Sequence, residues 1–185
     1  SAPPVAPSPA AATPPESDAI VLHWTGALDV RPLATPPQEL AHDDVFARFT
    51  SSAAGGVRLT DEASSAVAEG NLFEYAATTR AIVLAQSGTE SAVVSAPERG
   101  EARAGRFELS LATGHVRIPT GGTLTQLSAA GTSGDAGTKF IAWRNEADFD
   151  LALSGGPRGT LSGRPTSARV AGAAVAQAGN SWLAA

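Results

Sequence analysis

The chain has 185 residues, a formal net charge of −5 and no cysteine. This length allows one domain with a tail, the lack of cysteine excludes disulfides and thiolate metal ligands, and the acidic balance argues against a nucleic-acid partner. No run of about 18 apolar residues is present, so no transmembrane span is predicted. The chain starts at Ser1 and contains no methionine, and we therefore expect a processed chain or a piece of a longer protein.

Residues 1–18 are predicted to form a linker or tail. Six of the first fifteen residues are proline, which removes backbone donors and favours extended polyproline II structure. Residues 19–185 are expected to form a single β-jellyroll-like domain.

The domain opens with strand-like segments. Ala19–Leu33 predicts a strand, a bend at Gly26 and a second strand that ends near Pro32. Val45–Phe49 predicts another strand. The segment AHDDVFARF from Ala41 resembles AEGNLFEYA from Ala68, which suggests a weaker early copy of the repeat that follows.

A block of 28 residues recurs without a gap 34 positions later, as Val57–Leu84 and then Ser91–Ile118. The two blocks share a pattern rather than identities: a small-residue strand, a glycine, an alternating strand, a short polar turn and a return strand. A period of this size is typical of repeat architectures whose units bury their apolar faces against one another. It predicts two successive turns of one winding sheet.

The alternation is clearest in the second block. Phe107, Leu109 and Leu111 alternate with polar residues, and after the turn at 112–114 Val116 and Ile118 do the same. Because side chains point to opposite faces along a strand, each unit is predicted to be a hairpin with one apolar face.

The last third is less regular. Gly121-Gly122 and residues 129–137 predict turns or a loop, and Lys139–Leu153 predicts a hairpin that bends at 145–147. Residues 160–185 are rich in small residues, and within them 168–178 could be a short helix or an edge strand. Strand is preferred, because Gly172 interrupts the alanine-rich stretch and the preceding elements read as β. The predicted fold class is therefore all-β: a rolled antiparallel sheet built from hairpin repeats.

No motif for catalysis, for a cofactor or for a metal is found. His23, His42 and His115 are isolated in sequence and are expected to be solvated or hydrogen-bonded. Asp148 and Asp150 share one strand face and could hold a cation or act as a catalytic pair, but a solvent-facing strand explains them more simply. Trp24 and Trp143 are expected in the core.

The segments AVAEGNLFEYAATTRAIVLAQSG (Ala66–Gly88) and ARAGRFELSLATGHVRIPTGG (Ala102–Gly122) resemble the units of the OstA-like β-jellyroll family, the periplasmic lipopolysaccharide-transport proteins. The resemblance implies two sheets in a V or roll, an apolar groove for acyl chains, end strands that add edge-to-edge to a partner, and a periplasmic or other extracytoplasmic envelope location. It also implies which side chains line the groove: Phe73, Tyr75, Ile82, Leu84, Phe107, Leu109, Val116, Ile118, Trp143, Phe149 and Leu151.

The leading hypothesis is a non-catalytic envelope protein that binds or shuttles an amphiphile resembling lipopolysaccharide. The alternative is a structural repeat that assembles edge-to-edge with itself or a partner and takes no small ligand. A third interpretation is a β-sandwich that serves a hydrolase or a sugar-binding protein, which a convergent cluster of carboxylates or exposed tryptophans in a cleft would favour. Replacing Leu109 with aspartate is expected to abolish folding if its face is core.

Overall fold

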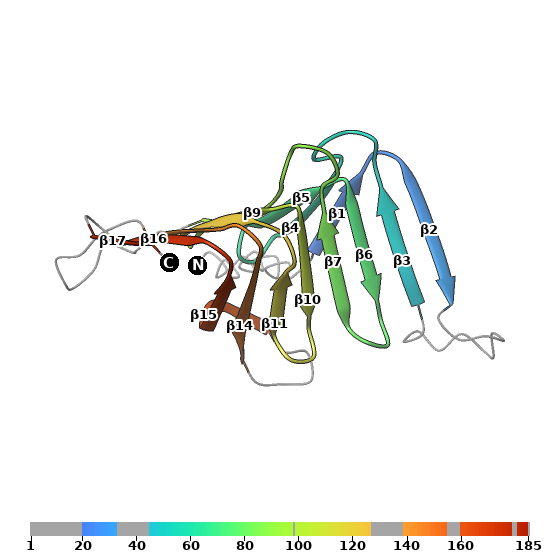
Figure 1. Cartoon of the computed structure of the whole chain (residues 1–185). Coiled ribbons are helices and arrows are strands. Elements are labelled where there is room, and N and C mark those ends of the chain that lie inside the picture. Colours follow the sequence, from blue (N-terminus) through green and yellow to red (C-terminus); the bar gives the residue numbers. More distant parts are fainter. Residues whose placement is uncertain are drawn as a thin grey trace, which may run out of the picture.

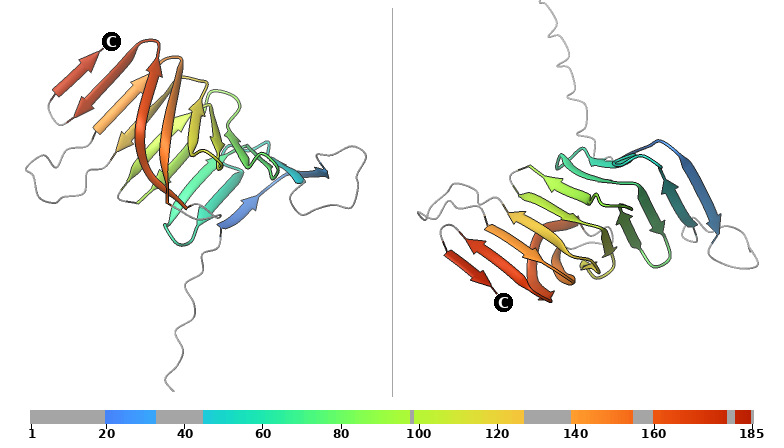
Figure 2. Two further views of the ribbon diagram at one scale, coloured as in Figure 1. Left: turned by 90° about the horizontal axis from the view of Figure 1, so that it is seen from below. Right: turned by 45° about the horizontal axis from the view of Figure 1, so that its top comes forward.

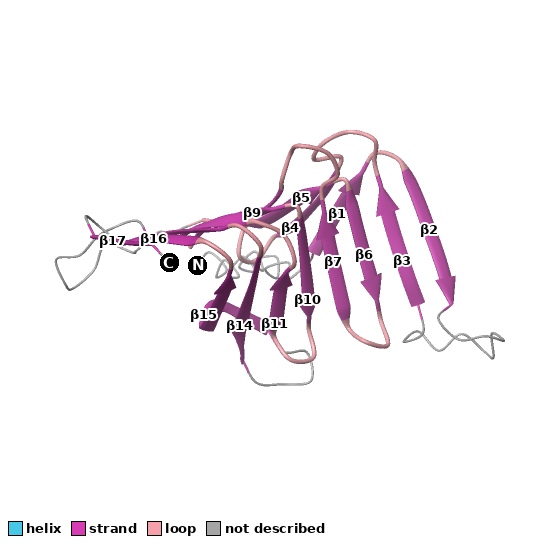
Figure 3. Cartoon of the chain, in the orientation of Figure 1, coloured by secondary structure: helices cyan, strands magenta, loops and turns pink. Residues whose placement is uncertain are grey.

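The computed structural model of the chain describes residues 20–32, 45–97, 99–126, 139–154, 160–178 and 181–184. Within these residues every element is a β-strand (Figure 3), which confirms the all-β class. No helix in the described ranges is long and apolar enough to cross a membrane. The predicted linker at 1–18 and loop at 129–137 lie outside the described residues.

The strands form two antiparallel sheets. Sheet A has nine strands in the order β1-β4-β5-β8-β9-β12-β13-β16-β17, and sheet B has eight in the order β15-β14-β11-β10-β7-β6-β3-β2. The strands of sheet A are β1 (Ile20–Trp24), β4 (Val57–Asp61), β5 (Ala66–Gly70), β8 (Ala92–Ala96), β9 (Gly100–Ala104), β12 (Gly122–Gln126), β13 (Lys139–Trp143), β16 (Ala174–Ala178) and β17 (Ser181–Ala184). Those of sheet B are β2 (Ala27–Pro32), β3 (Val45–Thr50), β6 (Leu72–Ala76), β7 (Ala81–Ala85), β10 (Arg106–Ser110), β11 (His115–Ile118), β14 (Glu146–Ser154) and β15 (Thr160–Ala171).

The chain winds from one sheet to the other after every second strand. It leaves β1 for the hairpin β2–β3 in sheet B, returns to sheet A for β4–β5, and continues in this way to β16–β17. All crossings lie on one side of the molecule. The sheets approach each other along this crossing side and diverge away from it, where the hairpin turns lie (Figures 1 and 2).

The 34-residue repeat is one complete turn of this winding. Strands β4 to β7 and β8 to β11 follow each other in the same order, and equivalent strand starts lie 34 or 35 positions apart. The hairpin turns also correspond, since Arg80 and Gly114 both adopt positive φ, at 50° and 72°. The prediction of two successive turns is therefore confirmed.

Three sequence-based expectations about the flanking segments are wrong. The predicted early copy equated Val45–Phe49 with the strand that begins at Leu72, β6. In the structure β3 is the second strand of its hairpin and pairs with β6, so within the repeat it corresponds to β7 instead. Strands β13 and β14 do not form a hairpin, because β13 pairs with β12 and β16 while β14 pairs with β11 and β15. Gly122 begins a strand instead of a turn.

Two further expectations about the flanking strands hold. The bend at Gly26 separates β1 from β2. Two features require glycine there: its φ of 147° is rarely adopted by other residues, and an added Cβ would lie 2.1 Å from the Thr50 carbonyl oxygen. The C-terminal segment forms strands β15, β16 and β17, with Gly172 at the crossing between the first two.

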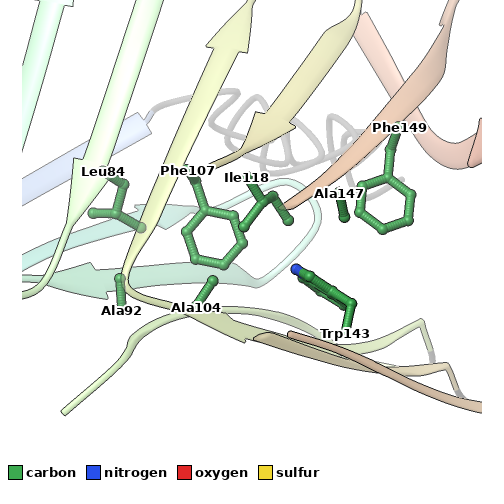
Figure 4. Close-up of a cluster of buried hydrophobic side chains, with 8 residues drawn as sticks. All are labelled: Leu84, Ala92, Ala104, Phe107, Ile118, Trp143, Ala147 and Phe149. Atoms are coloured by element: carbon green, nitrogen blue, oxygen red, sulfur yellow. The ribbon is translucent and has the colours of Figure 1, made fainter. Parts of the chain in front are cut away.

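The core is a strip along the crossing side (Figure 4). Large side chains of sheet B pack onto small or flat ones of sheet A. The buried cluster contains Leu84, Phe107, Ile118, Ala147 and Phe149 from sheet B, and Ala92, Ala104 and Trp143 from sheet A.

Close approach in this strip depends on residues without bulk. Gly122 pairs with Trp143, and the indole lies so near that an added Cβ on Gly122 would be 2.7 Å from Trp143 Cζ2. The indole N–H donates to the Thr120 carbonyl oxygen at 2.8 Å, so this buried polar atom is satisfied. Trp143 is thus a core residue, as predicted. Trp24 is not: it lies on the edge strand β1 and is 41% exposed, although its ring contacts Phe49.

Candidate functional site

The inner face, defined here as the surface of each sheet that faces the other sheet, is apolar well beyond the core strip. Strand pairing aligns Tyr75 with Ile82, Ile82 with Leu109, and Leu109 with Val116. These four side chains lie one step further from the crossings than Phe73, Leu84, Phe107 and Ile118. They are only half-buried, because the sheets have begun to diverge at this level.

Sheet A continues the apolar surface opposite this row. Leu59 pairs with Ala68, Ala68 with Val94, Val94 with Ala102, and Ala102 with Leu124, which pairs with Ile141. All are half-buried except Val94, which is 36% exposed. We call these residues, together with Tyr75, Ile82, Leu109 and Val116, the inner row.

The eleven residues predicted to line a groove divide into two groups. Six of them are buried side chains in the core strip: Phe73, Leu84, Phe107, Ile118, Trp143 and Phe149. The other five are half-buried: Tyr75, Ile82, Leu109, Val116 and Leu151. Because Leu109 is not fully buried, Leu109→Asp is a weaker test of folding than a change at Phe107.

The contribution of sheet A was missed apart from Trp143. Its inner residues are mostly alanine and glycine, as in Ala66–Gly70 and Gly100–Ala104, and such residues give little hydrophobic contrast between faces. The available signal was the periodicity itself, since the inward residues Val57 and Leu59 alternate with Arg58, and Ala102 and Ala104 alternate with Arg103.

The outer face of sheet B carries a row of charges across its strands. Asp29 pairs with Arg48, and Arg48 pairs with Glu74, with the Arg48 Nε 3.1 Å from the Glu74 carboxylate. Further along the same row Arg117 pairs with Asp148, which pairs with Arg169. Cross-strand pairs of opposite charge support this register and keep the face in water.

His115 lies between the two aspartates that were noted in the sequence. Its Nδ1 is 2.9 Å from an Asp150 oxygen and its Nε2 is 3.3 Å from an Asp148 oxygen. The Ser167 hydroxyl donates to the other Asp150 oxygen at 2.5 Å. The serine therefore contacts the aspartate and not the histidine, which is not the arrangement of a nucleophile with its base.

The protonated form of His115 is favoured by this arrangement. The hydrogen bond with Asp150 raises the pKa of His115, against a smaller opposing effect of desolvation, and Asp148 adds to the rise. The pKa of Asp150 is lowered, mainly by the Ser167 hydroxyl and then by His115. Within the described ranges, no three His, Asp or Glu side chains are arranged to hold a metal ion.

This cluster predicts a pH dependence of stability. A raised pKa in the folded state means that the His115 contribution is complete below the ordinary histidine pKa and is lost as pH rises through the folded value. We expect His115→Gln to lower the urea midpoint more at about pH 5.5 than at about pH 8. The difference will be small because both partners are partly exposed, as for other surface ion pairs. An equal loss at both pH values would contradict it.

Comparison of the chain with family models, with curated proteins and with solved structures finds no match.

Proposed function

We propose that the chain is a non-catalytic carrier that binds the acyl part of an amphiphile against the inner row. The observation that carries the proposal is the half-burial of a continuous apolar surface between two sheets. The side of the inner row nearer the crossings packs against the core cluster, through residues such as Ala68, Ala102 and Leu124. The part of an apolar face that stays accessible is stabilised when an apolar guest covers it. The charged outer face of sheet B offers no comparable surface.

The chemical nature of the ligand follows from this surface together with the sequence resemblance. The inner row presents aliphatic side chains and one tyrosine, which suits hydrocarbon chains. The resemblance implies a glycolipid of the lipopolysaccharide kind and a periplasmic or other envelope location, and we carry both forward as part of the proposal.

A matched pair of alanines tests the ligand surface. Ala102 lies in the inner row, whereas Ala142 of β13 pairs with Thr123 and Val175 on the outer face of the same sheet. Both are half-buried. We expect Ala102→Phe to weaken binding of the fluorescent fatty acid cis-parinarate by about tenfold or more, since the ring fills the space that the chain would take. Ala142→Phe should leave binding within about twofold of wild type.

The readout is a fluorescence titration, followed by competition with purified lipopolysaccharide. Circular dichroism confirms that both variants are folded. Equal affinity of the two variants would refute the assignment of the surface. If other fatty acids displaced cis-parinarate but lipopolysaccharide did not, acyl-chain binding would stand and only the identification of the ligand as a glycolipid would be refuted.

Edge-to-edge assembly is the second candidate function, and the N-terminal strands favour it. Strands β1 and β2 each end a sheet. They carry four of the six large hydrophobic side chains that are most exposed among the described residues, including Ile20 at 72% and Val30 at 58%. Exposed apolar edge strands pair readily with other chains. In the charged row of sheet B, Asp29 lies at one edge and Arg169 at the other.

Native mass spectrometry of the purified protein separates the two candidates. A lipid adduct on a monomer supports the carrier, whereas lipid-free oligomers support assembly.

A further inference from the structure

Two crossings between the sheets are longer than the connection requires. Residues 51–56 join β3 to β4, and residues 86–91 join β7 to β8, each with six residues. Residues 119–121 make the equivalent crossing from β11 to β12 with three. The two long crossings rise next to each other above the crossing side (Figure 1). Together with strands of sheet A they border an open pocket of about 410 Å³.

The loops around this pocket are braced by hydrogen bonds. The Asn71 side chain donates to the Ser87 hydroxyl at 2.5 Å and accepts from the Ser87 backbone N–H at 3.1 Å. The Gln86 backbone N–H donates to the Gly105 carbonyl oxygen at 2.9 Å. The pocket is therefore preformed, which limits the ordering cost of binding.

Gln86 is the one buried polar side chain among the described residues, and it lines the pocket. Its Oε1 accepts from the Gly55 backbone N–H at 3.4 Å, and its Nε2 donates to the Ser87 carbonyl oxygen at 3.3 Å. Both bonds are long. A primary amide has two N–H groups and two lone pairs, so these two bonds to described residues do not use the full hydrogen-bonding capacity of Gln86.

The floor of the pocket is a row on the outer face of sheet A. Glu69, Val93 and Arg103 lie side by side on β5, β8 and β9. The Arg58 guanidinium contacts the Glu69 carboxylate at 2.7 Å, and Glu101 contacts Arg103. Each charged group of the floor is thereby paired with a group of opposite charge, and all four side chains remain partly exposed.

The wall adds Glu90 and Ser91 from the second long crossing. The lining thus mixes carboxylates, a guanidinium, an amide and a hydroxyl, with Val93 as its one apolar side chain. Hydroxyl groups donate and accept hydrogen bonds at once, so a ligand rich in hydroxyls matches this mixture. An anion such as phosphate is disfavoured by the two glutamates.

We propose that this pocket binds a neutral saccharide of one or two sugar units. Its volume lies within the range of about 300–1,000 Å³ that is usual for small-molecule sites. No aromatic side chain lines it, so the sugar is held by hydrogen bonds without ring stacking, and the binding is weak. The pocket lies on the outer face of sheet A, away from the inner row, and the proposal does not depend on acyl-chain binding.

Two glycines provide a matched test. Gly55 and Gly88 both have positive φ, at 63° and 92°, and an added Cβ would meet nothing within 4 Å at either. Gly55 lines the pocket and Gly88 does not. Asparagine tolerates positive φ better than other residues with a Cβ. We expect Gly55→Asn to obstruct the pocket and Gly88→Asn to leave it open.

The measurement is a series of ¹H–¹⁵N NMR titrations of the folded full chain with glucose, galactose, N-acetylglucosamine, maltose and cellobiose. At least one sugar should shift the amides of residues 86–91 and of Val93 in a saturable manner. Its dissociation constant should rise by about tenfold or more in Gly55→Asn and stay within about twofold in Gly88→Asn.

A second pair of variants tests the contribution of the Glu90 carboxylate. Glu90→Ala should weaken the same sugar severalfold, whereas Glu62→Ala, in the exposed turn between β4 and β5, should not. The proposal is overturned if no sugar shifts these amides, if both glycine variants behave alike, or if the cationic probe putrescine binds here and the sugars do not. The fatty-acid titration described above reports on the inner row, so failure of either proposal is recognised separately.

Discussion

Replacing Phe107 with alanine is expected to lower the free energy of unfolding by about 3–5 kcal/mol. Phe107 is 7% exposed and stands in the centre of the core strip, between Leu84 of the neighbouring strand and the small residues of sheet A (Figure 4). Removal of the ring takes away its buried area and leaves a cavity, because the paired strands on both sides prevent collapse. Urea denaturation followed by circular dichroism gives the change.

Phe46 is the matched control. It lies on the outer face of β3, is half-buried, and packs under the Arg31 guanidinium, which is 4.7 Å from its ring centroid. Phe46→Ala should cost about 1 kcal/mol, because it loses a partly exposed contact and leaves no closed cavity. Similar losses of unfolding free energy for the two variants would contradict the conclusion that the core is a strip of inner-face side chains along the crossing side.

Replacing Gly122 with alanine is expected to destabilise the protein by about 1–3 kcal/mol although only one methyl group is added. The new Cβ would lie 2.5 Å from the Arg103 carbonyl oxygen and 2.7 Å from Trp143 Cζ2. The first neighbour is backbone in a paired strand, and the second belongs to a buried ring that is held by its bond to Thr120. Neither can move without loss of strand pairing or packing, so the thermal midpoint should fall.

Gly105 provides the comparison for this change. It makes the crossing between β9 and β10, and an added Cβ would meet the Thr120 side chain at 3.4 Å, which is ordinary contact. Gly105→Ala should therefore stay within about 0.5 kcal/mol of wild type. If Gly122→Ala proved equally harmless, the conclusion that Trp143 packs directly against the backbone of β12 would be contradicted.

The fold was predictable where side chains of contrasting polarity alternate. In Arg106–Ser110 and His115–Ile118 the inner and outer faces were assigned correctly, because the two-residue period of a strand leaves one choice once the apolar residues are marked. The ungapped spacing of 34 residues indicated one turn of the winding, because units that stack on one another recur at a fixed period.

Connectivity was harder to predict. Residues 145–147 were predicted to be a hairpin bend, but the chain crosses from sheet A to sheet B at 144–145, and β14 begins at Glu146. A short polar segment suits both roles, and only the pairing partners of β13 and β14 distinguish them. The early copy at Ala41 was misplaced because Val45–Phe49 has the alternation of either strand in a hairpin.

The depth of burial could not be predicted at all. Phe107 and Leu109 lie on one face of one strand, yet the first is buried and the second is half-buried, because burial here depends on the angle between the sheets. The polar pocket was likewise hidden, since its lining comes from Gly55, from residues 86–91 and from strands β5, β8 and β9. Only the winding brings these segments together.

The ungapped period has a consequence for how such a chain can change its size. Duplication of residues 57–90 would insert four strands, two into each sheet, with the order of strands and crossings preserved. Because neighbouring strands lie about 4.8 Å apart, each sheet would widen by about 10 Å in a single genetic event. The length of the protein across its strands can therefore change in whole steps while its cross-section is preserved.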